Sequence, residues 1–299
     1  MEYVLNAIRG LCMALADSVP GVSGGTIAFI LGFYDKFINS LDDLMYGKKE
    51  EKITALKFLI KIGIGWGIGM VLAMLFLTRV FESHIYQVSS LFMGFILLSI
   101  PVIIKEEKDS LKGKYYNVIF TLIGITIVCL ITYFNPIASG SESGVDITKL
   151  SIGLGLYIFF AGMVAVSAMV LPGISGSTLL LILGLYFPIT TGIREFLHLR
   201  LEYFLPLCLF GFGVIAGVLL VIRLIKLALK KARSQTIYCI IGLMIGSFYA
   251  IIMGPKTLSV PSDPMNFGTF SIVFFVIGGI LIFGLEKLKS VLESKTENK

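Results

Sequence analysis

Six apolar segments, each about long enough to cross a bilayer, run through this 299-residue chain. They lie near 58–78, 86–104, 117–134, 204–225, 237–253 and 270–286. A helix needs about 20 residues to span a hydrocarbon core of about 30 Å. Only 15% of the residues are charged, whereas soluble domains carry about 25%. The pattern predicts an all-α polytopic membrane protein, and it excludes a soluble domain, a disordered chain and a small disulfide scaffold.

One stretch of the sequence occurs twice. PGVSGGTIAFILGFY, which begins at Pro20, and PGISGSTLLLILGLY, which begins at Pro172, are identical at nine of fifteen positions. Weaker similarity aligns further pairs of residues: Gly65 with Gly211, Gly67 with Gly213, and Arg79 with Arg223. We therefore predict two repeats, an arrangement common in transporters.

The predicted repeats cover 1–137 and 151–288, with a linker at 138–150 outside the cytoplasm and a cytoplasmic tail at 289–299. Each repeat is expected to contain a broken or re-entrant helical hairpin followed by three of the apolar segments as transmembrane helices. The first hairpin should occupy 5–38 and the second 152–192. Re-entrant and fully spanning hairpins give the same loop sidedness, so both remain open.

Lysine and arginine indicate the orientation, because cytoplasmic loops are enriched in them. They gather in 36–57, 105–116, 226–236 and the C-terminal tail. These regions can share one side only if each hairpin enters and leaves the membrane on the same side. That condition inverts the second repeat relative to the first, and it predicts that both chain termini are cytoplasmic.

The doubled motif predicts a helix break and a binding site for an anion. Proline cannot continue an ordinary helix and glycine permits a tight reversal, so the breaks should fall at Pro20, Gly21, Pro172 and Gly173. After each break, hydroxyl groups and free backbone N–H groups at a helix start could hold a phosphate. The predicted ligands are Ser23, Gly24, Gly25, Thr26, Ser175, Gly176, Ser177 and Thr178. The alternative is that each motif is only a tightly packed kink.

Four charged residues within or beside apolar parts of the chain are candidates for a functional role, because charge is costly there and often functional. Asp17 precedes the first break and has Met169 as its counterpart, so we expect it to carry a coupled proton; alternatively, it caps the break or pairs with Arg9. Arg9, Arg79 and Arg223 are candidate phosphate ligands. The alternative for Arg79 and Arg223 is that they anchor helix ends at the membrane surface.

Other kinds of site find little support in the sequence. The four cysteines lack the spacing of a metal site, and the sequence contains no H-E-x-x-H, G-x-S-x-G or Walker A pattern. We therefore expect no metal, no cofactor and no enzymatic activity. The net charge of +6 is typical of a protein beside an anionic leaflet, so the bilayer rather than nucleic acid is the expected partner.

The paired motifs ADSVPGVSGGTIAFILGFY and LPGISGSTLLLILGLY resemble the signature of the bacterial polyprenyl-phosphate transporter family (PopT type), formerly a domain of unknown function. The resemblance covers essentially the whole chain. It implies transport of undecaprenyl phosphate from the outer to the cytoplasmic leaflet, for reuse in cell-wall synthesis. The positions that match are Arg9, Asp17, Pro20 to Thr26, and Pro172 to Thr178. Ser177, where the first repeat has Gly25, keeps a small residue.

The resemblance makes a lipid-phosphate translocase the leading hypothesis, with a polyprenyl-phosphate lipid as the partner in the bacterial cytoplasmic membrane. Proton coupling and alternating access, by rocking of one repeat against the other, belong to this hypothesis. A channel or exchanger for small anions is the second hypothesis, because the same helix starts suit chloride or phosphate. A membrane polyprenyl-pyrophosphate phosphatase is the third, although only Asp17 and hydroxyl groups are available near the motifs.

Overall fold

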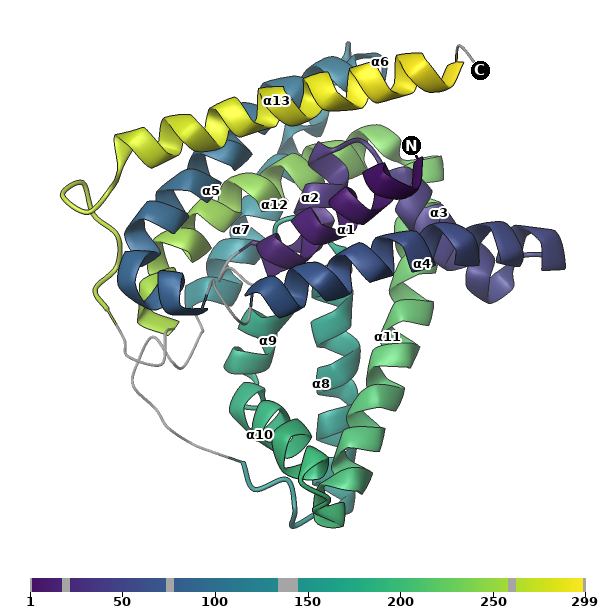
Figure 1. Cartoon of the computed structure of the whole chain (residues 1–299), viewed down its shortest axis with the longest axis vertical. Helices are drawn as coiled ribbons and strands as arrows, with labels where there is room; N and C mark the ends of the chain where they lie inside the picture. The colour runs from purple at the N-terminus through teal and green to yellow at the C-terminus, as the bar shows by residue number, and fades with distance from the viewer. Residues whose placement is uncertain (1, 18–21, 74–77, 134–144, 258–261, 298–299) are drawn as a thin grey trace.

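The computed structural model describes residues 2–17, 22–73, 78–133, 145–257 and 262–297, and the regular structure in these ranges is helical (Figure 1). Within them, six stretches are long and apolar enough to cross a membrane: Lys49–Leu72, His84–Glu106, Tyr115–Tyr133, Ile152–Val170, Leu201–Lys231 and Arg233–Lys256. Five of the six predicted segments each overlap a different one of these stretches. The sixth corresponds to a shorter apolar stretch, Ile272–Gly284. The chain is a polytopic α-helical membrane protein.

The α-helices longer than four residues follow the same order in both halves of the chain. The first half contains α1 (Glu2–Asp17), α2 (Gly24–Ile30), α3 (Tyr34–Tyr46), α4 (Lys49–Leu72), α5 (Thr78–Glu106), α6 (Lys108–Leu111), η2 (Tyr115–Asn117) and α7 (Val118–Tyr133). The second half contains α8 (Ile152–Val170), α9 (Gly176–Ile182), α10 (Tyr186–Leu197), η4 (Leu201–Tyr203), α11 (Phe204–Lys231), α12 (Arg233–Met253), η5 (Gly254–Thr257) and α13 (Ile272–Glu297). In each half, a seven-residue helix follows the motif.

Several helices are longer than the predicted segments. The region 36–57, predicted as a loop, is mostly helical, because α3 continues to Tyr46 and α4 begins at Lys49. Likewise, α11 continues to Lys231, and only Ala232 separates it from α12. Lysine and glutamate are good helix formers, so a helix can continue into water beyond its apolar part. Hydropathy therefore located the apolar stretches but not the helix ends.

The two halves use matching helix pairs. α1 packs along α4, and α8 packs along α11. The remaining long helices pair between the halves, since α5 packs against α13 and α12 packs against α7. The pairs α1–α4 and α8–α11 therefore each lie within one half, whereas the pairs α5–α13 and α7–α12 join the two halves.

Glycines bring the paired helix backbones together. A Cβ atom at Gly65 would collide with the backbone oxygen of Ala7, and one at Gly213 would collide with that of Phe159. Small residues allow such close approach between helices in a membrane. The matching contacts make Gly213, rather than Gly211, the counterpart of Gly65. The sequence alignment of these glycines was thus two residues out of register.

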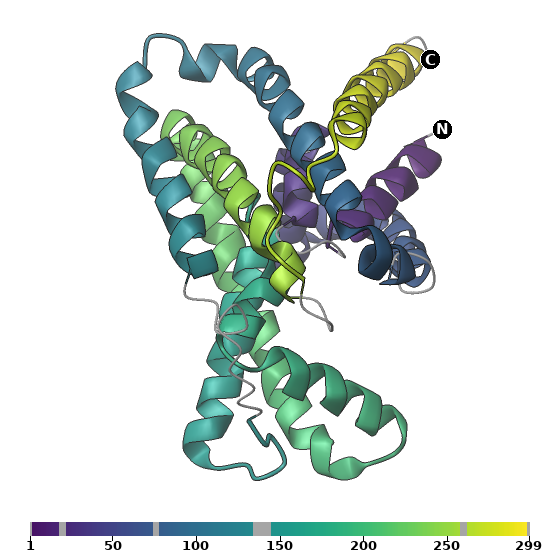
Figure 2. The same cartoon turned by 90° about the vertical axis from the view of Figure 1, so that its left-hand side faces the viewer.

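The first part of the second half, from α8 to α11, forms a projecting lobe. Both views show α8, α10 and α11 extending together to one end of the molecule, where the connection between α10 and α11 lies (Figures 1 and 2). The other end of α11 approaches α3, and the two helices are in contact. The start of α1 and the end of α13 lie on one side of the molecule in both views.

Replacing Gly65 by alanine should destabilise the protein. The added methyl group must push α1 and α4 apart, and overpacking of this kind costs about 1–3 kcal/mol. Gly67→Ala is the matched control, because a Cβ atom there meets nothing within 4 Å. In a helix position where nothing opposes the added methyl group, alanine should stabilise by up to about 1 kcal/mol. Thermal unfolding in detergent measures both variants, and equal shifts would contradict the packing assigned to Gly65.

Candidate functional site

Asp17 ends α1 and binds the start of α2. Its Oδ1 atom accepts a hydrogen bond from Gly24 N at 2.6 Å, and its Oδ2 atom accepts one from Trp66 Nε1 at 3.0 Å. A Cβ atom at Gly24 would lie 2.7 Å from Asp17 Oδ2, so a larger residue there would require the carboxylate to shift. Of the interpretations considered for Asp17, the capping of the helix break is the one that the geometry displays.

Ser23 forms the N-cap of α2. Its backbone is extended, with φ −133° and ψ 150°, and its Oγ atom accepts a hydrogen bond from Thr26 N at 3.3 Å. The two hydroxyl oxygens, Ser23 Oγ and Thr26 Oγ1, are 3.2 Å apart. Both side chains are about 1% exposed, so they lie in the protein interior. The expected helix break is present between Asp17 and Gly24, although Pro20 and Gly21 lie outside the described residues.

The two motif segments touch each other. Thr26 Oγ1 accepts a hydrogen bond from Gly173 N at 2.8 Å, and Ser23 Oγ donates one to Leu171 O at 3.2 Å. Tyr34 adds a third bond, from its hydroxyl group to Val170 O at 3.2 Å. The first segment therefore satisfies backbone groups that the end of α8 leaves free.

The second segment turns at Pro172 and Gly173. Gly173 has φ +87°, a left-handed conformation that favours glycine, and a Cβ atom there would lie 2.5 Å from the backbone oxygen of Leu243. The predicted break at this position is thus present between α8 and α9. Both residues are buried.

The start of α9 differs from the start of α2 in charge. A Cβ atom at Gly176 would lie 3.3 Å from the Cβ atom of Met169, whereas Gly24 faces the Asp17 carboxylate. Ser175 is buried, and its Oγ atom lies 2.7 Å from that of Ser177. Ser177 and Thr178 are partly exposed. This segment therefore presents hydroxyl groups with an apolar residue where the first segment has an acid.

The three candidate arginines do not share one location. Arg9 is buried, its guanidinium lies 4.8 Å from the centre of the Phe33 ring, and its Nη1 atom donates to Asn6. It thus contacts the residue that precedes α3. Arg223 lies on α11, 4.1 Å from the centre of the Tyr46 ring at the end of α3. Arg79 is in the first turn of α5, and its side chain is outside the described part of the structure.

Sequence reasoning missed two residues that belong to this site. Trp66 binds Asp17 from α4, and Tyr34 reaches the end of α8 from the start of α3. Tyr34 is a position at which the two motifs are identical, which was a usable signal. Trp66 is the single tryptophan of the chain and lies in a glycine-rich helix, so its sequence context indicated packing more than binding.

Comparison with known proteins assigns the chain to a family. The profile of the VCA0040-like family, described as undecaprenyl phosphate translocase-like, matches residues 13–268. A Staphylococcus aureus protein named polyprenyl-phosphate transporter is 36% identical over 290 residues, which are 95% of this chain and 96% of that protein. A Vibrio cholerae protein of the same name is 29% identical over 269 residues, 87% of this chain and 80% of that protein.

No solved structure matches the chain at a significant level. The family description and the names of both relatives denote transporters rather than enzymes, which agrees with the expectation of no enzymatic activity. The match spans both copies of the motif and most of the apolar helices between and after them. The resemblance indicated by the doubled motif is confirmed: this chain belongs to the undecaprenyl phosphate translocase-like family of membrane proteins.

Proposed function

We propose that this chain translocates a polyprenyl phosphate from the outer to the cytoplasmic leaflet of the bacterial cytoplasmic membrane, with Asp17 carrying a coupled proton. The names of the two relatives support the substrate, and undecaprenyl phosphate is the lipid in the family description. The observation that carries the proposal is the direct contact between the two motif segments. This contact places the hydroxyl groups and backbone amides of two helix breaks beside each other.

The phosphate is the part of the lipid that needs a polar site, because the apolar prenyl tail dissolves in the hydrocarbon core of the membrane. Ser177 and Thr178 supply partly exposed hydroxyl groups at the start of α9. Met169 places no negative charge against that helix start. An incoming phosphate therefore meets less repulsion at α9 than at α2, where Asp17 is bound. Irregular backbone of this kind is tolerated in a membrane where protein or a polar cavity covers it.

Asp17 links the proton to the phosphate in this proposal. Its carboxylate accepts the hydrogen bond of the Gly24 N–H group, so it takes the place of a bound anion at the start of α2. A phosphate that binds the same amide must displace it, and two neighbouring anions repel each other. Protonation of Asp17 removes this repulsion. The substrate and the proton then enter together, and release of the proton lets Asp17 return to Gly24.

The positions of the chain ends and of the basic residues support the proposed orientation in the membrane, with the basic end in the cytoplasm. The start of α1 and the end of α13 lie on one side of the molecule (Figures 1 and 2). The basic end of α11, which carries Lys226 and Lys230, approaches α3. Its other end, at Phe204, has few basic residues nearby in the sequence. By the enrichment of lysine and arginine on the inside, the basic end belongs in the cytoplasm, and alternating access between two inverted repeats would carry the phosphate there.

A leaflet assay tests the translocation directly. Proteoliposomes containing undecaprenyl phosphate labelled on one leaflet should lose accessible lipid only when the protein is present, and faster under a pH gradient. Protein-free vesicles are the control. Chloride flux without lipid movement would instead identify a small-anion exchanger, and release of inorganic phosphate from the pyrophosphate lipid would identify a phosphatase.

Asp17→Asn should abolish the effect of the pH gradient, because the amide cannot take up the proton. The side-chain oxygen can still accept one of the two hydrogen bonds, so folding should survive a loss of about 1–3 kcal/mol. Asp109→Asn is the control, because Asp109 is an exposed residue of α6. Transport rates with and without the gradient are the measurement. If Asp17→Asn keeps the full response of the wild type, Asp17 is not the proton carrier.

Trp66 should report phosphate binding at the motifs. Displacement of Asp17 removes the acceptor of the Trp66 indole N–H group, and this change of environment should shift its fluorescence. The chain has one tryptophan, so the signal has a single source. Titration of the detergent-solubilised protein with farnesyl phosphate should give a saturable shift, whereas farnesol should not. Identical responses to the two compounds would argue against phosphate binding near Asp17.

A further inference from the structure

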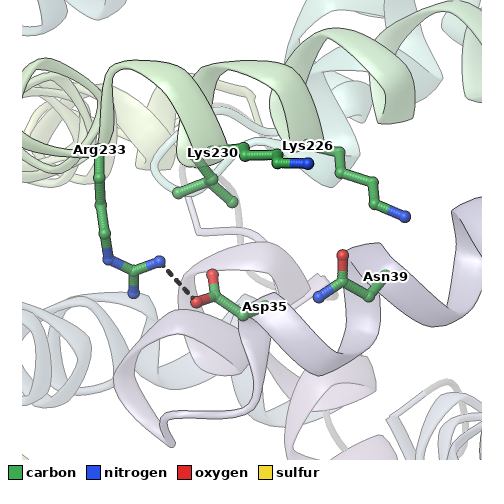
Figure 3. Close-up of a pocket in the computed structure, with 6 residues that line it drawn as sticks. Asp35, Asn39, Lys226, Lys230 and Arg233 are labelled. Atoms are coloured by element: carbon green, nitrogen blue, oxygen red, sulfur yellow. Dashed lines mark hydrogen bonds and ion pairs between the residues drawn. The ribbon is translucent and has the colours of Figure 1, made fainter.

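A charged pocket lies between α3 and the junction of α11 with α12, beyond the C-terminal end of α2. Its volume is about 260 Å³, and its lining residues are Asp35, Asn39, Lys226, Leu229, Lys230 and Arg233 (Figure 3). Ser23 and Thr26, which contact the second motif, are at the opposite, N-terminal end of α2. The pocket is thus separate from the contact between the two motifs.

The basic residues of the pocket come from one short part of the chain. Lys226 and Lys230 are four residues apart on α11, a spacing that places both side chains on one face of the helix, and Arg233 begins α12 after Ala232. In Figure 3 they line the upper wall of the pocket, and Asp35 and Asn39 rise from α3 below. The sequence marked these cations only as cytoplasmic charge. Their gathering around a cavity depends on how α11 and α12 meet α3.

Two of the three cations already have partners. Arg233 Nε donates to Glu107 Oε2 at 2.9 Å, and Arg233 Nη1 donates to Asp35 Oδ2 at 2.8 Å. Lys226 Nζ lies 2.6 Å from Asp42 Oδ2 and 3.6 Å from Asp43 Oδ1. Within the described ranges, Lys230 has no carboxylate partner at ion-pair distance. Glu107, Asp42 and Asp43 do not line the pocket.

Lys230 gives the pocket wall a cation for a phosphate group. Of the three cations that line the pocket, Arg233 and Lys226 are paired with carboxylates, so Lys230 carries the positive charge that is not already neutralised. A phosphate monoester carries about −1.5 to −2 at neutral pH. The volume is below the roughly 300 Å³ at which pockets for whole drug-sized ligands begin, so it suits a head group rather than an entire lipid.

We propose that this pocket is a second binding site for a phosphate group, held by Lys230 together with Arg233 and Asn39. A phosphate there takes the place of Asp35 on Arg233, while the pair with Glu107 keeps the guanidinium in position. A smaller cavity of about 100 Å³ shares Asp35 and Arg233 and reaches Phe29 of α2. The inference rests on the proposed function only for the claim that the phosphate belongs to the lipid.

The acylation rate of the Lys230 amine tests the pocket in the full-length protein. The reaction is followed by mass spectrometry in detergent, at matched ionic strength, with inorganic phosphate, farnesyl phosphate or farnesol. At ligand concentrations about ten times Kd, only about a tenth of the pockets remain empty, so Lys230 should react about tenfold more slowly. Lys231 is the internal reference, because it is exposed and does not line the pocket.

The three ligands separate the possible sources of the phosphate. Protection by both phosphate compounds supports a general phosphate site, and protection by farnesyl phosphate alone supports a lipid head-group site. Protection by neither, equal protection by farnesol, or equal protection of Lys231 overturns the proposal. Trp66 fluorescence, measured in the same titration, distinguishes the two sites. A Trp66 response without Lys230 protection would support binding at the motifs and contradict binding in the pocket. Lys230 protection without a Trp66 response would support binding in the pocket and contradict binding at the motifs.

A variant of Asn39 tests phosphate binding in the pocket without changing Lys230. Asn39→Asp changes the shape of the side chain little but adds a negative charge to the pocket wall. It should raise the Kd for phosphate, measured from the protection of Lys230, at least about tenfold, since a charge-assisted contact is worth about 1.5–3 kcal/mol. Lys231→Gln is the control variant and should leave the protection unchanged. Full protection in Asn39→Asp would contradict phosphate binding in this pocket.

Discussion

The hydrogen bonds between the two helix breaks are the constraint on which the rest of this structure depends. A chain that interrupts a helix in apolar surroundings leaves backbone N–H and C=O groups unpaired, and each costs several kcal/mol in a membrane. Here the breaks supply partners for each other: Thr26 accepts from Gly173 N, and Ser23 donates to Leu171 O. A single break without such partners would leave its backbone groups unpaired and would destabilise the protein. Two breaks in contact hold the halves of the protein together at their least regular points.

The two breaks are similar in sequence but differ in charge. Asp17 occupies the start of α2, and the corresponding place beside α9 holds Met169. A symmetric pair of acids would repel an anion from both sides, whereas a pair without any acid would offer no group to carry a proton. The single carboxylate, held by Gly24 and Trp66, is the feature on which the proposed coupling depends.

Close helix packing and ion pairs connect the rest of the molecule to this centre. Glycines let α1 lie against α4 and α8 against α11, so the helices that lead into both breaks are held along their length. Ion pairs from Lys226 and Arg233 join α11 and α12 to the first half at the basic end. Apolar side chains therefore face the hydrocarbon, and the polar side chains described above find their partners in the protein interior.

The sequence by itself determined the membrane class, most of the apolar spans, the doubled motif and the difference between Asp17 and Met169. These features are local, since hydropathy, proline and glycine act on their own segment of chain. The tertiary structure decided the partners: Trp66 for Asp17, Gly173 for Thr26, and Asp35 for Arg233. Those residues are 49, 147 and 198 positions apart, and no local periodicity records which of many buried polar groups will meet. The same reason explains why the sequence could suggest Arg9 as a candidate phosphate ligand but could not predict its contact with Phe33.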